Sequence, residues 1–197
     1  MSRSANSHSL SPFQTALKEA IETFEALPVF EAPLAEAAQT LLHCLTSGHK
    51  LLICGNGGSA SDSAHIATEF TCRFKDDRRP YPAIALNVDG GLLTAIGNDY
   101  AFQEVFARQV AAFGQPGDVL ITISSSGKSR NVLSALEEAR RRQMKTICFL
   151  GKGGGFTAGA ADIEFIIPGT VTARIQEAQK FLLHVLCEMV DSELPKE

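Results

Sequence analysis

Apolar residues in the early part of the chain recur at the three- and four-residue spacing of amphipathic helices. The first such stretch starts after Ser11, which forms a capping-box pattern with Gln14, and Pro28 interrupts it. The second stretch ends at Gly48, a residue type that commonly stops helices. The spacing predicts an N-terminal helical pair within residues 11–48, whose apolar face must be buried against the sheet or a partner subunit.

Short and nearly continuous apolar runs replace this spacing from residue 50 onward. Such runs are typical of strands that are buried on both faces of a parallel sheet. Five strands are expected, at residues 51–54, 83–86, 119–123, 146–150 and 163–167. Helical spacing separates and follows them, at about residues 59–74, 101–113, 129–143 and 172–193. This alternation predicts an α/β fold with a doubly wound, five-stranded parallel sheet, preceded by the helical pair.

The domain organisation follows from the absence of an internal repeat or a long linker in the sequence. A chain of 197 residues, 45% of them hydrophobic, is long enough to bury one sizeable core. We therefore expect a single domain over residues 11–197, N-terminal helices included, after a disordered polar tail at residues 1–10.

Composition argues against several classes of protein. The 18 Lys and Arg residues and 22 Asp and Glu residues give a net charge of −4 without a long basic run, which disfavours nucleic acid and anionic membranes as partners. The apolar runs fall far short of the roughly 20 residues of a membrane-spanning helix, and the N-terminus shows no secretory signal. The five cysteines form no CxxC motif, as expected of a reduced cytoplasmic protein.

The glycine loop, residues 55–60 (GNGGSA), follows the first predicted strand and opens a helix. Glycine-rich backbone there lets a phosphate approach closely, and the helix N-terminus favours an anion. The same residues satisfy the relaxed dinucleotide fingerprint G-x-G-x-x-A, with Asp89 after the second strand as a candidate ribose-binding acid. Three interpretations remain open for this loop alone: a dinucleotide site, a site for another phosphorylated or polar ligand, and a tight turn without a ligand.

The serine loop, residues 124–129 (SSSGKS), follows the third predicted strand and also opens a helix. Serine hydroxyls and free N–H groups at a helix N-terminus form an anion cradle, although such a loop can also serve only as a cap. A dinucleotide fold does not need this second cradle. A sugar phosphate needs one loop for its phosphate and another for the hydroxyls near its reacting carbons, so the two loops together favour a phosphosugar.

Polar residues on two predicted helices are candidates for chemistry. His65 and Glu69 are four residues apart on the helix that the glycine loop opens, so they share one face. Such a pair can bind a metal, transfer a proton or form an ordinary surface contact, and its position near the loop favours the first two. The last helix carries Gln176, Gln179 and His184 among apolar residues, and a lone histidine there is more often part of the core. Gln176 and His184 lie within about 80° of each other on the helical wheel, which suggests a polar pocket lined by the helix.

Five motifs together resemble the sugar isomerase (SIS) domain, and within it the phosphoheptose isomerase family. They are CGNGGSASDSAHIATEF, RPYPAIAL, TAIGNDYAFQEVFARQV, GDVLITISSSGKSRNV and ARIQEAQKFLLHVL. They span about residues 50–190, and their combination is highly specific although each motif alone is not. The resemblance implies the flavodoxin-like SIS fold and a homotetramer.

The resemblance also implies a set of site residues. Those that would bind substrate are Asn56, Gly57, Gly58, Glu69, Asn98, Asp99, Ser124, Ser125, Ser126, Ser129 and Gln176, with the serines holding the phosphate. Those that would bind one zinc ion per subunit are His65, Glu69, Gln176 and His184. Glu69 and His184 would also transfer protons. Gln179 departs from the family pattern, because many relatives have His there, and Thr68 and the NVDGG segment vary in ways that could adjust substrate choice.

The activity that the resemblance implies is an aldose–ketose isomerisation. Sedoheptulose 7-phosphate would become D-glycero-D-manno-heptose 7-phosphate through an enediol, as a precursor for lipopolysaccharide. The reaction needs a base near C1 and C2, an acid–base group for the two oxygens and stabilisation of an oxyanion, which zinc can provide, but no redox cofactor. The alternative is a non-catalytic SIS protein that binds phosphosugar and a replication initiator. The titratable residues favour the enzyme, because a scaffold does not need them.

The implied zinc ligands raise a geometric problem. Gln176 and His184 are eight residues apart, which is about 12 Å along a straight helix. Zinc bonds of about 2 Å cannot span that distance. Either Gln176 precedes the regular helix, or the ligands come from different subunits, which would place the active sites at the interfaces of an obligate oligomer.

Overall fold

The computed structural model describes residues 10–196. Its centre is a five-stranded sheet in the order β2-β1-β3-β4-β5. The strands are β1 (Leu51–Gly55), β2 (Ala83–Ala85), β3 (Val119–Ser124), β4 (Lys145–Gly151) and β5 (Ile163–Ile167). All four pairings are parallel, so the predicted doubly wound parallel sheet is confirmed. The tail expected at residues 1–10 lies outside the described residues except for Leu10, which is exposed.

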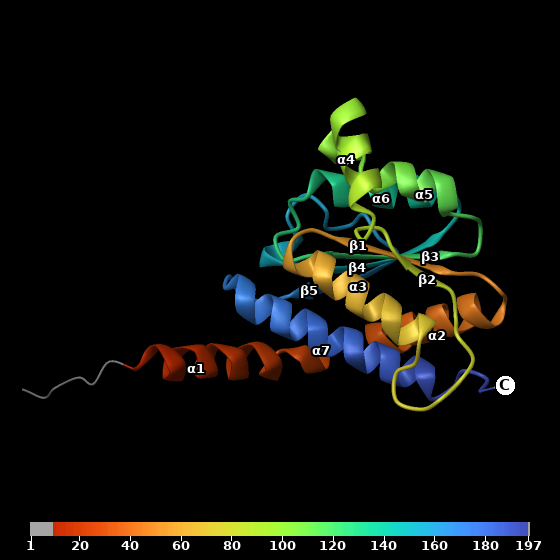
Figure 1. Cartoon of the computed structure of the whole chain (residues 1–197). Helices are drawn as coiled ribbons and strands as arrows, with labels where there is room; N and C mark the ends of the chain where they lie inside the picture. Colours follow the sequence, from red (N-terminus) through yellow and green to blue (C-terminus); the bar gives the residue numbers. More distant parts are fainter. Residues whose placement is uncertain (1–9, 197) are drawn as a thin grey trace, which may run out of the picture.

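Helices cover both faces of the sheet (Figure 1). Those on one side are α1 (Pro12–Glu25), α2 (Glu31–Thr46), α3 (Gly58–Thr71) and α7 (Thr172–Asp191). Those on the other side are α4 (Gly90–Asp99), α5 (Ala107–Phe113) and α6 (Arg130–Arg141). Short 3-10 turns are η1 (Leu27–Phe30), η2 (Phe102–Glu104) and η3 (Lys152–Gly154). The two sides enclose two apolar cores, because the strand side chains alternate between the faces.

The N-terminal helical pair forms as expected. Ser11 and Gln14 form the reciprocal capping box of α1, with hydrogen bonds of 2.9 and 3.2 Å. Helix α1 lies along the outside of α7 and projects beyond it (Figure 1), and the rings of Phe24 and Phe181 are 5.2 Å apart. The chain itself leaves much of the apolar face of α1 uncovered, since Phe13 is 74% exposed.

One helix was not predicted, and another was predicted too long. The helix expected over residues 101–113 is divided into η2 and α5, and α4 precedes it. The Asp89 carboxylate accepts a hydrogen bond of 2.9 Å from Leu92 N, so the candidate ribose-binding acid caps α4. Two glycines open this helix, and their low helix propensity conceals it in the sequence.

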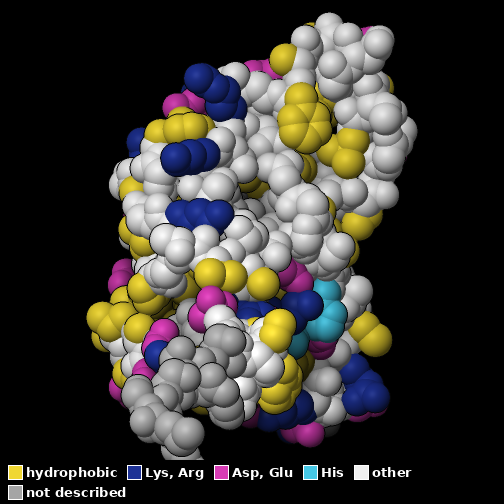
Figure 2. Space-filling view, turned by 90° about the vertical axis from the view of Figure 1, so that its left-hand side faces the viewer, with side chains coloured by type: hydrophobic (Ala, Val, Ile, Leu, Met, Phe, Trp, Pro, Cys, Tyr) yellow, Lys and Arg dark blue, Asp and Glu magenta, His cyan; other side chains and the backbone are white. Residues whose placement is uncertain are grey.

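The sheet topology shows where a ligand should bind. The chain leaves β1 through α3 toward β2, whereas β3 lies on the other side of β1, so the switch point is between β1 and β3. Ligands of doubly wound folds bind at the carboxyl ends of strands flanking such a point. The glycine loop and the serine loop both begin there. Figure 2 views this side of the molecule, where Lys and Arg side chains gather at the upper left and a histidine is visible at the right.

Candidate active site

The glycine loop brings part of the predicted substrate site together at the N-terminus of α3. Gly57 precedes this helix with a positive φ of 58°, and Gly58 is its first residue. A Cβ on Gly58 would lie 2.6 Å from Gln176 Nε2, so the Gln176 amide can occupy this position only because residue 58 has no side chain. Gln176 therefore lies against the glycine loop of its own chain.

The serine loop leaves hydroxyl groups available for an anion. Ser129 is the N-cap residue of α6, yet its hydroxyl makes no capping hydrogen bond and lies 3.4 Å from Ser124 Oγ. Gly127 packs so closely on the loop after β4 that a Cβ there would lie 2.0 Å from Gly154 O. Thr157 donates a hydrogen bond of 2.9 Å from Oγ1 to Gly127 O. These contacts of Gly127 with Gly154 and Thr157 hold the serine hydroxyls beside the N–H groups of α6, which is a favourable arrangement for binding a phosphate.

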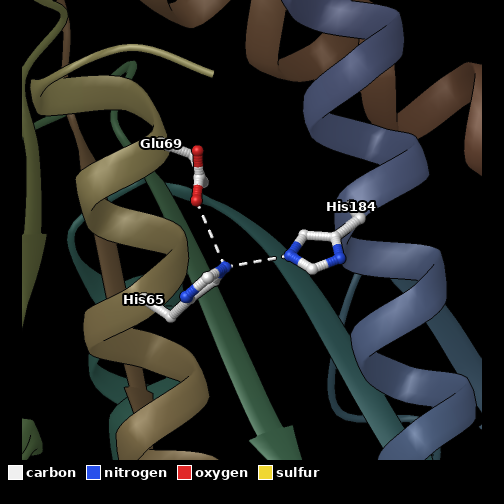
Figure 3. Close-up of side chains that lie close together, drawn as sticks. All are labelled: His65, Glu69 and His184. Atoms are coloured by element: carbon white, nitrogen blue, oxygen red, sulfur yellow. Dashed lines mark hydrogen bonds and ion pairs between the residues drawn. The ribbon is translucent and has the colours of Figure 1, made fainter. Parts of the chain in front are cut away.

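Three ligand-type side chains meet between α3 and α7, and we call them the His65 cluster: His65, Glu69 and His184 (Figure 3). His65 Nε2 lies 2.9 Å from His184 Nε2 and 3.2 Å from Glu69 Oε1. One donor atom from each of the three residues lies within 4.8 Å of the other two. The cluster could therefore hold a metal ion or move protons.

The electrostatics of the cluster suit both roles. Burial, with the neighbouring His65, holds the pKa of His184 below its ordinary value of 6.5. His184 is therefore neutral at pH 7, as a metal ligand must be. The Glu69 side chain is only 16% exposed, whereas that of His65 is 44% exposed, so the cluster opens to solvent on the His65 side.

Other predicted site residues lie away from this cluster. Helix α7 is continuous from Thr172, so the idea that Gln176 precedes the regular helix is wrong. Gln176 therefore lies about 12 Å from His184 along the axis. Asn98 and Asp99 end α4, on the opposite face of the sheet from α3 and α7 (Figure 1), with Asn98 Nδ2 donating 2.9 Å to Asp99 Oδ1.

Comparison with known proteins places the chain in a family. The sequence profile of the SIS domain matches residues 13–151. A phosphoheptose isomerase from Shewanella sp. (strain W3-18-1) is 45% identical over 185 residues, which cover 92% of each chain. The chain belongs to the phosphoheptose isomerase family of SIS-domain proteins.

Solved structures of this family have the same fold. The phosphoheptose isomerase GmhA from Neisseria gonorrhoeae is 42% identical, with a TM-score of 0.85 over 90% of this chain and 96% of that one. A phosphoheptose isomerase from Francisella tularensis is 40% identical, with a TM-score of 0.84 over 92% and 95% of the two chains. The resemblance in the five sequence motifs, and the SIS fold that it implied, are thus confirmed.

Sequence reasoning missed a buried arginine that supports the site. Arg78 Nη2 donates a hydrogen bond of 2.6 Å to the main-chain oxygen of Glu69, and Nη1 donates one of 3.0 Å to Phe70 O. Arg78 Nε lies 2.6 Å from the carboxylate of Asp191 at the end of α7. Arg78 therefore ties the last turn of α3, which carries Glu69, to the last turn of α7. It follows a run of charged residues that reads as an ordinary surface loop.

Gln179, which was not assigned a role in the site, lies inside the subunit. Its side chain is fully buried, and among residues 10–196 neither Nε2 nor Oε1 has a hydrogen-bond partner. The departure from the family pattern at this position thus lies in the interior of the subunit.

The structure also bears on the cysteines and on whether a helix could cross a membrane. The five cysteines are free, and burial raises the pKa of the Cys148 thiol to about 12, so that thiol is unreactive at neutral pH. Within the described part of the chain, no helix has both the length and the apolar character needed to cross a membrane.

Proposed function

We propose that this protein is a phosphoheptose isomerase that converts sedoheptulose 7-phosphate to D-glycero-D-manno-heptose 7-phosphate, which then serves lipopolysaccharide precursor synthesis. The observation that carries the proposal is the His65 cluster, a group suited to proton transfer in a chain whose relatives are named for this activity. No finding supports the alternative of a non-catalytic phosphosugar-binding protein that binds a replication initiator.

The serine loop and the glycine loop bind different parts of the substrate in this proposal. The serine loop holds the phosphate through Ser124, Ser125, Ser126 and Ser129, at the positive end of the α6 dipole. The Ser124 and Ser126 hydroxyls accept hydrogen bonds of 3.2 Å from Gly127 N and Lys128 N, so their O–H groups can still donate to an anion. Asn56, Gly57 and Gly58 of the glycine loop contact the sugar hydroxyls. The reacting carbons then lie toward α3, where the His65 cluster stands.

Glu69 and His184 move the protons. The Glu69 carboxylate removes a proton from C1 of the ketose while O2 gains the single ring N–H proton of neutral His184, which gives the enediol. His184 then takes the proton of O1, and Glu69 returns its proton to C2, which completes the aldose without net change in atoms or electrons. Glu69 Oε1 faces His65, so Oε2 is the oxygen assigned to the C–H proton.

We propose zinc as the ion of the His65 cluster. Two ligands at about 2.0–2.1 Å from a tetrahedral zinc lie about 3.3 Å from each other. The separations of 2.9 Å and 3.2 Å that His65 makes are close to this value, and the third separation, between Glu69 and His184, stays within 4.8 Å. Imidazole and carboxylate are ordinary zinc ligands, so the residues fit the ion once Glu69 and His184 move closer together. Bound zinc would act as a Lewis acid on the substrate oxygens.

The active sites are proposed to lie at subunit interfaces of a homotetramer. Gln176, the fourth proposed zinc ligand, is too far from His184 in the same chain, and Asn98 and Asp99 lie across the sheet, so a partner subunit would supply them. The uncovered apolar face of α1 supports assembly. An apolar groove beside this face is lined by residues that include Phe24, Leu27, Phe30, Leu34 and Phe181.

Two further expectations complete the proposal. Residues 11–197 would act as one domain, because η1 and α2 share the core of α7, and α1 contacts α7 through the rings of Phe24 and Phe181. A cytoplasmic location is supported by the free cysteines, which suit a reducing compartment.

The test is to incubate zinc-loaded protein with a panel of ketose phosphates and to measure aldose formation. Sedoheptulose 7-phosphate should be converted, and Glu69→Gln should lower turnover by about 10²–10⁴ while it still binds the sugar, because the amide cannot accept a C–H proton. Glu36→Gln, on the exposed face of α2, is the matched control and should behave as wild type. Activity of Glu69→Gln within twofold of wild type would remove Glu69 from the mechanism.

A further inference from the structure

A pair of asparagine side chains joins the two ligand-binding loops. Asn56 Nδ2 donates a hydrogen bond of 2.9 Å to Asn131 Oδ1, and Asn131 Nδ2 donates one of 2.9 Å to Asn56 Oδ1. Asn56 belongs to the glycine loop after β1, and Asn131 is the second residue of α6, directly after the serine loop. The two residues are 75 positions apart in the sequence.

The pair spans the switch point of the sheet. Strands β1 and β3 are neighbours whose carboxyl ends meet in register, Gly55 opposite Ile123. Asn56 is the first residue after β1, whereas α6 starts after the serine loop that follows β3. The amide pair therefore crosses the place where doubly wound folds bind their ligands.

The reciprocal pattern fixes the orientation of the two amides relative to each other, and Val132 N, which donates a hydrogen bond of 3.0 Å to Asn131 Oδ1, fixes which way the Asn131 amide faces. If either amide turned over alone, oxygen would face oxygen and NH₂ would face NH₂, which loses both hydrogen bonds and adds repulsion. Each amide also keeps one N–H that the pair does not use. Asn131 is only 3% exposed and cannot readily reach a ligand, but Asn56 is partly exposed at the glycine loop.

We infer that Asn131 is a positioning residue, which acts on substrate only through Asn56 by fixing the direction of its free N–H and the spacing of the two loops. The inference rests on the proposed function, in which the glycine loop binds the sugar and the serine loop binds the phosphate. A rigid spacing matters because one substrate must satisfy both loops at once, and preorganisation lowers the entropic cost of binding.

A purely structural role at the start of α6 is the competing explanation. Asn131 Oδ1 lies 3.0 Å from Val132 N, so loss of Asn131 could also disturb the helix start. That effect would not depend on Asn56, and it would weaken the binding of any phosphate at the serine loop. The two explanations therefore differ in a double-mutant cycle and in the binding of inorganic phosphate.

The experiment measures dissociation constants by calorimetry in the Glu69→Gln background, so that turnover does not interfere. Because Glu69 is also a proposed zinc ligand, the zinc content of every sample is measured and matched before the variants are compared. Asn56→Ala, Asn131→Ala and their combination are each titrated with sedoheptulose 7-phosphate and with inorganic phosphate. Ser134→Ala is the matched control, because Ser134 is buried on α6 and accepts a hydrogen bond from Gln103 rather than from Asn56. If Asn131→Ala does not fold, Asn131→Leu replaces it, since Leu fills similar space without polar atoms.

Asn131→Ala should weaken the binding of sedoheptulose 7-phosphate about tenfold, equivalent to about 1.4 kcal/mol, and change that of inorganic phosphate less than twofold. With Ala at position 56, the same change should have less than a twofold effect. An equal loss in both backgrounds, a parallel loss for inorganic phosphate, or no loss at all would overturn the inference. If the wild-type protein bound sedoheptulose 7-phosphate without isomerising it, the proposed function would be contradicted, but the double-mutant cycle could still be measured. If it did not bind this sugar, both the proposed function and the role of Asn131 would be overturned.

Discussion

Mixing two inactive variants should restore activity if Gln176 acts in the site of a neighbouring subunit. Glu69 belongs to the His65 cluster of its own chain, whereas Gln176 lies eight residues before His184 on one continuous helix. That spacing is about 12 Å along the axis, which zinc bonds of about 2 Å cannot bridge. Glu69→Gln subunits and Gln176→Ala subunits should therefore each be inactive alone and complement each other in mixed oligomers.

The expected recovery follows from random assembly. In an equal mixture, half of the clusters retain Glu69, and half of the neighbouring chains retain Gln176. About a quarter of the interface sites therefore contain both intact parts, and the mixture should reach about a quarter of the wild-type activity per subunit.

The assay is aldose formation from sedoheptulose 7-phosphate after co-refolding of the two variants, with bound zinc measured in the same samples. The control mixture is Glu69→Gln with His184→Ala. Because Glu69 and His184 meet within one chain, no mixed oligomer of that pair contains a complete cluster, and it should stay inactive. The reasoning is refuted if the first mixture stays inactive or if the control mixture recovers.

Three other predictions follow from single contacts. Ser126→Ala should raise KM for the sugar phosphate about tenfold to hundredfold with little change in kcat, since a hydrogen bond to a charged phosphate is worth about 1.5–3 kcal/mol; unchanged steady-state kinetics would exclude Ser126 from the phosphate site. Arg78→Met should lower the free energy of unfolding in urea by about 3–5 kcal/mol, because Asp191 stays buried without its partner, and adding Asp191→Leu should recover part of the loss; a change under 1 kcal/mol would contradict this. The pKa of His184 is lowered by burial and by His65, so the unfolded state binds more protons, and the stability that the neutral ring confers is present above about pH 6.5 and lost as the pH falls toward the folded value. In metal-free buffer the unfolding free energy should therefore drop more steeply below pH 6.5 in wild type than in His184→Gln, and parallel curves would disprove the assignment.

Sequence reasoning succeeded where local spacing determines structure. The five strands were predicted because each is a nearly continuous apolar run. The central strands β1, β3 and β4 are buried on both faces, whereas the edge strands β2 and β5 alternate between buried and more exposed residues. His65 and Glu69 were expected on one face because helix geometry places residues four apart side by side, and they do face each other. Helix α4 was missed because it is short and begins with two glycines.

The spacing of residues along the sequence could not predict contacts between distant parts of the chain. His184 meets His65 across 119 residues, and only the family resemblance suggested that the two act together. Arg78 lies just outside the five motifs, and Asn131 belongs to the motif GDVLITISSSGKSRNV without a role assigned to it, since a charged residue in a loop and a polar residue at a helix start are both common. Their roles depend on which side chain the fold places opposite them, and that information is absent from local patterns.

The separation of α4 from the His65 cluster bears on how this protein can evolve. Helix α4 packs through Leu92, Leu93 and Ile96 on the core of the far face, while α3 and α7 pack on the other core. Substitutions in the exposed part of α4 and at the exposed Val88 of the NVDGG segment, whose two glycines open this helix, thus leave the packing around the proton-transferring groups untouched, whereas Asn87 of the same segment donates a hydrogen bond of 3.2 Å to Gly55 O of the glycine loop. Natural variation in this region can therefore change the sugar preference with little effect on the groups that transfer protons. A first mutant library aimed at altered sugar preference should be placed there.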